Sequence, residues 1–191
     1  MSKSYRTLPP RVLANRKLGS IKTAIVEGKC VKNDCHPLNK AMIKELIKEL
    51  PVEFVNGLKS IKLSDRNSRK IGCPYAVYRE DEKSIIMYSV PKQEWVFSNL
   101  SQNVRDMYFE HGAEEIQNES SIIINWVSSL DLAYFMFKEV FLHEIGHHFI
   151  NQYKCRNKQP MREVENELLA NLHADRLSKD ALFYEVWEKY A

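Results

Sequence analysis

The sequence predicts an α+β fold with a small, mostly antiparallel sheet. Three observations lead to this prediction: an amphipathic helical segment comes early, several short apolar stretches follow it, and two long helical segments close the chain. Helices that are separated in sequence from the strands are typical of α+β rather than of alternating α/β proteins. A chain of 191 residues is long enough for one domain with a buried core.

We expect residues 1–38 to form a basic, irregular extension and residues 39–191 to form the folded domain. The extension contains three prolines and shows no helical or strand periodicity. The segment Asn39–Leu50 then has apolar residues at helical spacing. Asn39 is suited to cap this helix and Pro51 to stop it.

Short extended stretches follow this helix, bordered by Gly, Asp and Asn. Residues 98–120 are polar and are expected to hold a short helix that ends near Gly112. The predicted strands are Glu53–Val55, Leu58–Leu63, Tyr75–Tyr78, Ser84–Val90 and Ser121–Val127.

Two helices are predicted at the end of the chain. The first runs from about Asp131 to Gln152 and is capped by Ser128 or Asp131. The second begins after Pro160, continues to about Ser178, and is either extended or followed by a last short helix over residues 180–190.

The charge is distributed unevenly. Residues 1–44 contain ten Lys and Arg but only two acids, whereas the remaining residues contain 18 basic and 23 acidic side chains. Such a basic segment either contacts nucleic acid or another polyanion, or is simply solvated. No apolar run approaches the ~18 residues of a membrane helix, and the start lacks the apolar core of a signal peptide. We expect a cytoplasmic protein without a membrane partner.

The segment His143-Glu144-Ile145-Gly146-His147 has the pattern H-E-x-x-H and lies in the first of the two closing helices. Residues four apart lie on the same helix face, so His143 and His147 can direct two imidazole nitrogens at one ion. We predict a zinc site with these two ligands. Glu144 is the expected catalytic base, because it can accept the proton of a zinc-bound water.

The alternative to a metal site is a surface helix on whose polar face the H-E-x-x-H pattern occurs by chance. Apolar residues along this helix, including Leu132, Phe135 and Val140, indicate that it faces a core instead. Burying the Glu144 carboxylate there without a partner or a metal ion would be costly. This argument favours the metal site.

A catalytic zinc site requires a third protein ligand. The position six residues after the second histidine is Tyr153, so a third histidine at that spacing is excluded. Glu167 on the next helix is our first choice, with Glu163 and Asp175 as alternatives. Small residues on the Glu167 face would let the two helices approach closely. These residues are Ala170, Asn171, Ala174, Ser178 and Ala181.

The sequence HEIGHH followed by ENELLANLHAD resembles a small gluzincin-type zinc metallopeptidase, which implies a zincin-like domain. Within that clan, Ala170-Asn171 and Ala174 are similar to the ImmA/IrrE family of compact peptidases that cleave or relieve a transcriptional repressor. The resemblance implies His143, His147 and Glu167 as zinc ligands, Glu144 as the base and Asn171 as a supporting residue behind the ligands.

In zincins, a strand at the sheet edge above the active helix binds extended substrate. The stretch Ser84–Val90 could take this role by strand addition, and the alternative is a core strand. The residues concerned are Ile85, Ile86, Met87 and Tyr88. Candidates for stabilising an oxyanion are Tyr134, Tyr153, His148 and His173. Because His148 points about 100° away from His147, we expect it on the surface or in a second layer.

The four cysteines are Cys30, Cys35, Cys73 and Cys155. A cytoplasmic location disfavours disulfides. The spacing Cys30-x4-Cys35 suggests a second, structural zinc, but no second close pair accompanies it. We therefore expect reduced thiols and one zinc ion per chain.

The expected function is zinc-dependent hydrolysis of peptide bonds in an intracellular protein or peptide, by Glu-assisted attack of zinc-bound water. The alternative is a zinc-containing regulatory protein that keeps the zincin fold and acts on a partner, such as a repressor or nucleic acid, without proteolysis.

Overall fold

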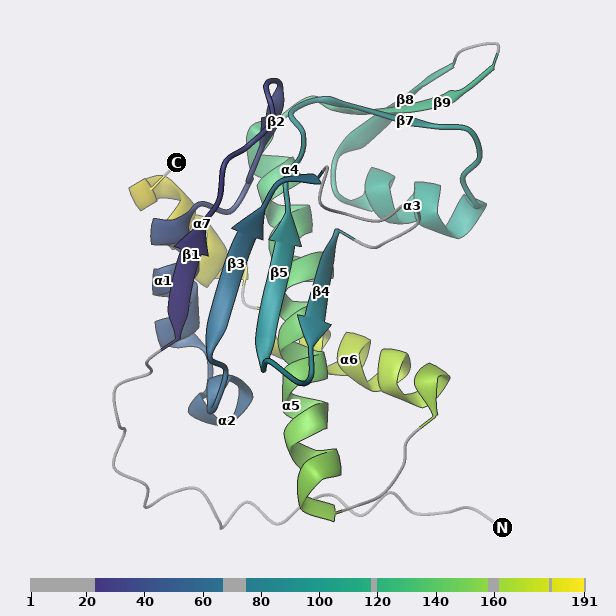
Figure 1. The fold of residues 1–191 in the computed structure, drawn as a ribbon. Helices are drawn as coiled ribbons and strands as arrows, with labels where there is room; N and C mark the ends of the chain where they lie inside the picture. Colours follow the sequence, from purple (N-terminus) through teal and green to yellow (C-terminus); the bar gives the residue numbers. More distant parts are fainter. Residues whose placement is uncertain (1–22, 67–74, 118–119, 158–161, 179, 191) are drawn as a thin grey trace.

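A mixed sheet of strands β1, β3, β5 and β4 occupies the centre of the molecule, and helices α1, α5 and α7 lie behind it in the view of Figure 1. The computed structural model describes residues 23–66, 75–117, 120–157, 162–178 and 180–190. Within these residues, no helix has the length and apolar character needed to cross a membrane. The α+β class predicted from the sequence is confirmed.

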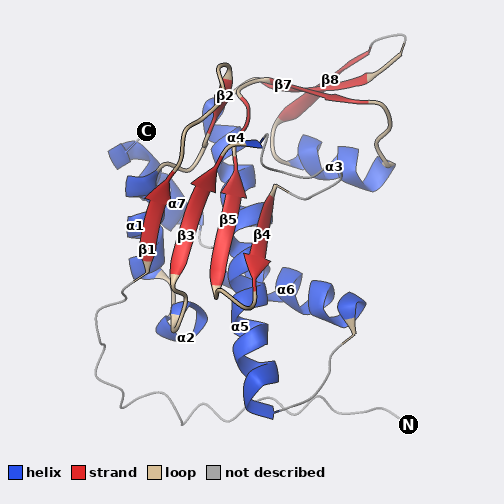
Figure 2. Cartoon of the chain, in the orientation of Figure 1, coloured by secondary structure: helices blue, strands red, loops and turns tan. Residues whose placement is uncertain are grey.

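Figure 2 shows how helices and strands are distributed along the chain. The strands are β1 (Ala24–Glu27), β2 (Asp34–Cys35), β3 (Ser60–Ser64), β4 (Ala76–Arg79), β5 (Ser84–Tyr88), β6 (Val90–Pro91), β7 (Glu94–Phe97), β8 (Ala113–Gln117) and β9 (Ile122–Trp126). The helices are α1 (Lys40–Glu49), α2 (Val52–Val55), α3 (Gln102–Glu110), α4 (Ser129–Phe135), α5 (Leu142–Asn157), α6 (Glu163–Leu177) and α7 (Asp180–Tyr190).

The central sheet has the order β1-β3-β5-β4. Strands β1, β3 and β5 are parallel to one another, and β4 runs antiparallel to β5. The prediction of a mostly antiparallel sheet is therefore wrong for the central sheet. The reason is the crossover through α1 and α2, which returns the chain so that β3 lies parallel to β1. Two smaller sheets, β2-β6 and β7-β9-β8, are antiparallel.

The N-terminal part of the chain departs from its prediction. Ala24–Glu27, which we expected to be irregular, forms strand β1 and pairs with Ser60–Leu63 of β3. Most residues of β1 are exposed to solvent. Its sequence, Ala-Ile-Val-Glu, does not alternate between apolar and polar residues, and such alternation is the signal by which a half-buried strand is predicted. Residues 1–22 lie outside the described part of the structure.

Helix α1 begins where its sequence predicts. Asn39 is the N-cap, and its side-chain oxygen accepts a hydrogen bond of 3.0 Å from the Met42 backbone N–H. After Pro51, however, residues 52–55 form the short helix α2, so the predicted strand Glu53–Val55 is wrong. Proline is well suited to precede a first helical turn, and Val55 of this turn is buried in the core.

The predicted helix Asp131–Gln152 forms from Ser129 onward, with Ser128 as its cap. It is not uniform, because Met136–Phe141 adopts a π-helical turn between α4 and α5. The buried residues Phe137 and Phe141 of this turn join the core. Such π-turns occur frequently at functional sites, and here the turn comes directly before the H-E-x-x-H segment.

Candidate metal centre

The H-E-x-x-H segment lies at the start of α5 and is anchored by buried apolar neighbours. Leu142 and Ile145 are fully buried, whereas the imidazoles of His143 and His147 are partly exposed on another face of the helix. Their two Nε2 atoms are 2.9 Å apart. The i and i+4 spacing therefore brings both nitrogens to one point, as predicted from the sequence.

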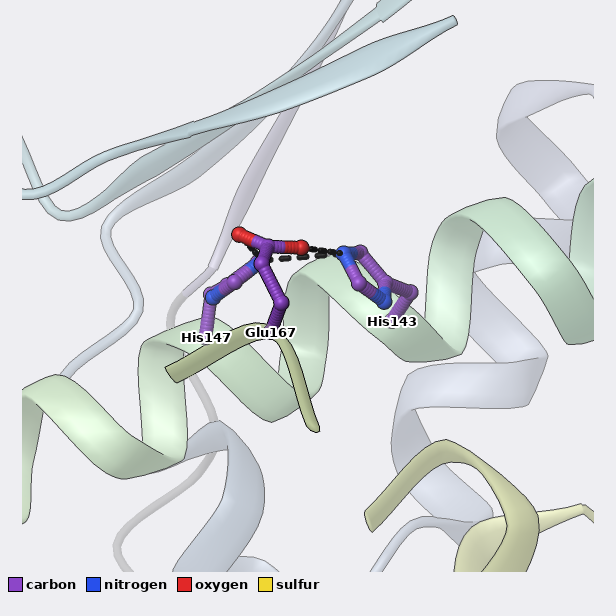
Figure 3. A group of neighbouring side chains, drawn as sticks. All are labelled: His143, His147 and Glu167. Atoms are coloured by element: carbon purple, nitrogen blue, oxygen red, sulfur yellow. Dashed lines mark hydrogen bonds and ion pairs between the residues drawn. The ribbon is translucent and has the colours of Figure 1, made fainter. Parts of the chain in front are cut away.

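Helix α6 crosses α5 closely at this point, because both helices have small residues there. A Cβ atom added to Gly146 would lie 2.7 Å from the Ala170 carbonyl oxygen. Ala170 and Ala174 are buried in this interface. The close crossing lets Glu167 direct its carboxylate between the two imidazoles, as Figure 3 shows.

The three side chains have the geometry of a metal site. Glu167 Oε2 lies 3.3 Å from His143 Nε2, and Glu167 Oε1 lies 3.4 Å from His147 Nε2. Ligand atoms that share a tetrahedral zinc ion at 2.0–2.1 Å are about 3.3 Å apart. The distances between the candidate ligand atoms, 2.9–3.4 Å, fit this requirement. The donor set of two imidazoles and one carboxylate also suits zinc.

Asn171 lies behind this cluster and supports one of its histidines. Its Oδ1 atom is 2.7 Å from His143 Nδ1. Because an amide oxygen can only accept, Nδ1 carries the proton and Nε2 presents its lone pair to the cluster. Metal-bound histidines usually donate their second nitrogen in this way, so the structure places Asn171 where the sequence predicted a supporting residue.

Glu144 is buried next to the cluster, with only 5% of its surface exposed. Burial raises the pKa of its carboxyl group to about 8, and a hydrogen bond from the Tyr78 backbone opposes this rise. The negative charge of Glu167 raises the pKa further. A cation at the cluster would lower it again and favour the carboxylate form that a general base requires.

These groups open into a cleft of about 700 Å³ between α5, α6 and strand β4. The volume lies within the range of small-molecule binding sites. The polar and charged residues that line the cleft include Tyr78, Glu80, Lys138, Glu139, Asn151, Asn171 and Asp175 together with the cluster and Glu144.

The strand that borders this cleft is β4, not the predicted Ser84–Val90. Strand β5, with Ile85, Ile86, Met87 and Tyr88, lies between β3 and β4, and both of its edges are paired. It is therefore a core strand, and its proposed role in binding substrate is wrong. A strand whose backbone groups are already used on both sides cannot add a further strand.

The alternative third ligands do not join the cluster. Among the described residues, the group whose ligand atoms lie within 4.8 Å of one another consists of His143, His147 and Glu167. Asp175 lines the cleft two turns further along α6. Glu163 is exposed one turn before Glu167.

Two of the four cysteines, Cys30 and Cys35, have side chains in the described part of the structure. Cys30 and Cys35 are free thiols in the structure. Burial raises the pKa of the Cys35 thiol to about 11, which disfavours the thiolate form that metals bind. Cys73 and the side chain of Cys155 lie outside the described residues.

The oxyanion candidates whose side chains are described, Tyr134, His148 and His173, are not among the residues that line the cleft. Tyr134 donates a 2.6 Å hydrogen bond to Asp180, and the ring of His173 packs edge-on against Phe149. His148 is fully buried and lies in a second layer. The side chain of Tyr153 lies outside the described part of the chain.

Sequence reasoning did not anticipate Tyr78 or the Glu139–His111 pair. Tyr78 forms a hydrogen bond with Glu144 through its backbone. Because every residue except proline has a backbone N–H, a sequence pattern cannot predict this bond. Glu139 lines the cleft one turn before His143, and His111 Nε2 lies 2.9 Å from Glu139 Oε1. The i−4 spacing from His143 would have revealed Glu139, but nothing in the sequence connects it with His111 of another segment.

Residues 1–22, which hold most of the basic side chains of residues 1–44, lie outside the part of the chain that the structure describes. The cleft itself offers the more specific chemistry: two imidazole nitrogens, one carboxylate and a buried acid.

In comparisons with protein-family models, curated proteins and solved structures, no match to this chain is found.

Proposed function

We propose that this protein is a zinc-dependent metallopeptidase that hydrolyses peptide bonds of an intracellular protein. The observation that carries this proposal is the convergence of His143, His147 and Glu167 at one end of a cleft, with Glu144 buried beside them. A zinc ion bound there would supply Lewis acidity, which polarises a carbonyl group and acidifies water.

The residues of the chain have separate roles in this mechanism. His143, His147 and Glu167 would hold the ion as its three protein ligands. Glu144 accepts a proton from the water that attacks the peptide carbonyl carbon, and it then delivers this proton to the leaving nitrogen. The Tyr78 backbone N–H fixes the Glu144 carboxylate for both transfers.

Strand β4 is suited to bind the substrate backbone. Tyr88 N–H donates to Tyr75 C=O over 2.9 Å, and β4 continues this antiparallel ladder with β5. Hydrogen bonding then alternates along the strand, so the backbone groups of Ala76 and Tyr78 point away from β5. The Tyr78 N–H is used by Glu144, which leaves the Ala76 N–H and C=O and the Tyr78 C=O for a substrate backbone. We expect an extended peptide to pair with this edge.

The test combines metal analysis with substrate identification. Purified protein should bind one zinc ion, and the proteome of the source cells should show cleavages with wild type that are missing with Glu144→Gln. Glu144→Gln should still bind zinc, because Glu144 is not in the ligand cluster. Glu163→Gln serves as the matched control and should cleave like wild type. Cleavage by Glu144→Gln at the wild-type rate would exclude this mechanism. If Glu144→Gln loses cleavage but keeps the biological activity of the wild type, a regulatory binding protein is favoured instead.

A further inference from the structure

The last histidine of the HEIGHH run, His148, is not part of the metal cluster, and the proposed mechanism does not use it. His148 follows His147 and is 0% exposed. Its Nε2 atom lies 3.1 Å from the Asn56 carbonyl oxygen, and its Nδ1 atom lies 3.1 Å from the Tyr78 hydroxyl. Successive helical residues point about 100° apart, so His148 faces β4 and the segment after α2 while His147 faces the cleft.

These partners fix the positions of the protons. The Asn56 carbonyl can only accept, so His148 Nε2 carries a proton. Both groups that bond the ring are neutral, and a buried charge beside neutral groups would be costly, so the imidazole is neutral. Nδ1 then has a lone pair, and the Tyr78 hydroxyl donates to it. Gln152 Nε2 lies 3.2 Å from His148 Nε2 but donates to the Glu53 carbonyl instead.

Tyr78 is thereby held at two points. Its hydroxyl donates to His148 and accepts a 3.1 Å hydrogen bond from Asn151 Nδ2. Its backbone N–H bonds the carboxylate of Glu144. Glu144 and His148 are four residues apart and share one face of α5, so consecutive turns of the helix hold the backbone and the hydroxyl of one tyrosine.

We propose that His148 is a positioning residue for peptide hydrolysis: by holding the Tyr78 hydroxyl, it keeps β4 against α5 and the Tyr78 N–H on Glu144. This role rests on the proposed peptidase function, whereas the hydrogen-bond network can be tested without it. The arrangement also gives a reason for two consecutive histidines, one directed at the metal site and the other at the substrate-binding edge.

Nuclear magnetic resonance tests the network directly. Long-range ¹H–¹⁵N spectra should show His148 protonated at Nε2 only, and Tyr78→Phe should shift the Nδ1 resonance. The Tyr78 amide should exchange slowly in wild type and faster in Tyr78→Phe and His148→Leu. The Val77 amide, which points toward β5, should keep its protection and so report that β4 has not unfolded. Protonation at Nδ1, or unchanged Tyr78 exchange, would overturn the proposal.

Kinetics test the consequence for the reaction. With the substrate defined by the Glu144→Gln comparison, Tyr78→Phe and His148→Leu should lower kcat about 10-fold or more, with zinc affinity unchanged. His148→Gln should recover much of the rate, since its amide can accept from Tyr78 and donate to Asn56. Asn56→Ala keeps the backbone carbonyl and should behave like wild type. Equal loss in His148→Gln and His148→Leu would indicate a packing role only. Absence of zinc binding by wild type would instead refute the proposed function and leave the spectroscopic result standing.

Discussion

Gly146 and Ala170 are in contact where helices α5 and α6 cross, and no side chain larger than hydrogen fits at Gly146. A Cβ atom there would lie 2.7 Å from the Ala170 carbonyl oxygen and 3.0 Å from its Cα atom. Both of these are backbone atoms, which cannot turn aside as a flexible side chain can. The glycine within the H-E-x-x-H segment therefore sets the distance between the helix that carries the two histidines and the helix that carries Glu167.

The first prediction concerns Gly146→Ala. Alanine stabilises an exposed helix by roughly 1 kcal/mol relative to glycine. Here the clash should outweigh this gain and destabilise the protein by about 1–3 kcal/mol, as overpacking does. Displacement of α6 should also weaken zinc binding through Glu167. Chemical denaturation and zinc titration measure the two effects, and a stabilised variant with wild-type zinc affinity would contradict the assigned contact.

The second prediction distinguishes the candidate third ligands. Glu167→Gln keeps the shape of the side chain but removes the charge that lies 3.3–3.4 Å from both imidazoles. Loss of a supporting residue behind a metal ligand costs about 10–100-fold in metal affinity, so loss of the ligand itself should exceed this range. Competition with a chromophoric chelator measures the affinity.

Glu163→Gln and Asp175→Asn are the controls for this experiment. Both remove one negative charge from the same helix, but neither carboxylate lies in the cluster. Their zinc affinities should stay close to that of wild type. A larger loss in either control than in Glu167→Gln would assign the third ligand to that residue instead.

The third prediction concerns the stability of the metal-free protein. Burial raises the pKa of Glu144 to about 8 from an ordinary value of 4.5. The folded state therefore binds this proton more tightly than the unfolded state, and its stability should fall as pH rises from about 4.5 to 8. Glu144→Gln has no such proton, and a pKa raised from 4.5 to about 8 corresponds to a stability gain of up to about 4 kcal/mol over wild type at pH 8.

Denaturation in the presence of a chelator at pH 5 and pH 8 checks this expectation. The difference between Glu144→Gln and wild type should be less than about 1 kcal/mol at pH 5 and should grow toward pH 8. A difference that does not change with pH would mean that Glu144 is not desolvated in the folded protein.

The local features of the site follow from the sequence, whereas its surroundings do not. Helical periodicity and the four-residue spacing predict that His143 and His147 share a face, and small residues on α6 predict the approach of Glu167. The order of strands depends on pairings between distant segments, which a one-dimensional pattern does not contain. For that reason the sequence pattern does not reveal that β4, rather than β5, occupies the edge of the sheet next to the cleft.

Helix boundaries show the same contrast. Asn39 predicts the start of α1, because a cap acts on residues three positions away. The strand expected at Glu53–Val55 is instead a helical turn, because burial of Val55 in the assembled core decides the conformation of so short a segment. Features that depend on neighbouring residues, such as a helix cap, can be predicted from the sequence. In a short segment, tertiary packing can override the local conformational preference.

The last prediction uses Asn39, which has two roles. Its Oδ1 atom accepts from the Met42 N–H over 3.0 Å, and its Nδ2 atom donates to the Tyr190 carbonyl over 3.0 Å. Asn39→Ala removes the cap of α1 and its bond to the end of α7. We expect a loss of about 1–2 kcal/mol in the free energy of unfolding.

Ser101→Ala is the matched control, because Ser101 occupies the N-cap position of α3 without a side-chain hydrogen bond to the helix. It should cost at most a few tenths of a kcal/mol, as ordinary surface substitutions do. Asn39→Asp separates the two roles of Asn39, since a carboxylate still accepts from Met42 but cannot donate to Tyr190. Its stability in urea denaturation should therefore lie between those of wild type and Asn39→Ala. Equal costs for Asn39→Ala and Ser101→Ala would show that neither hydrogen bond of Asn39 contributes to holding α1 and α7 in place.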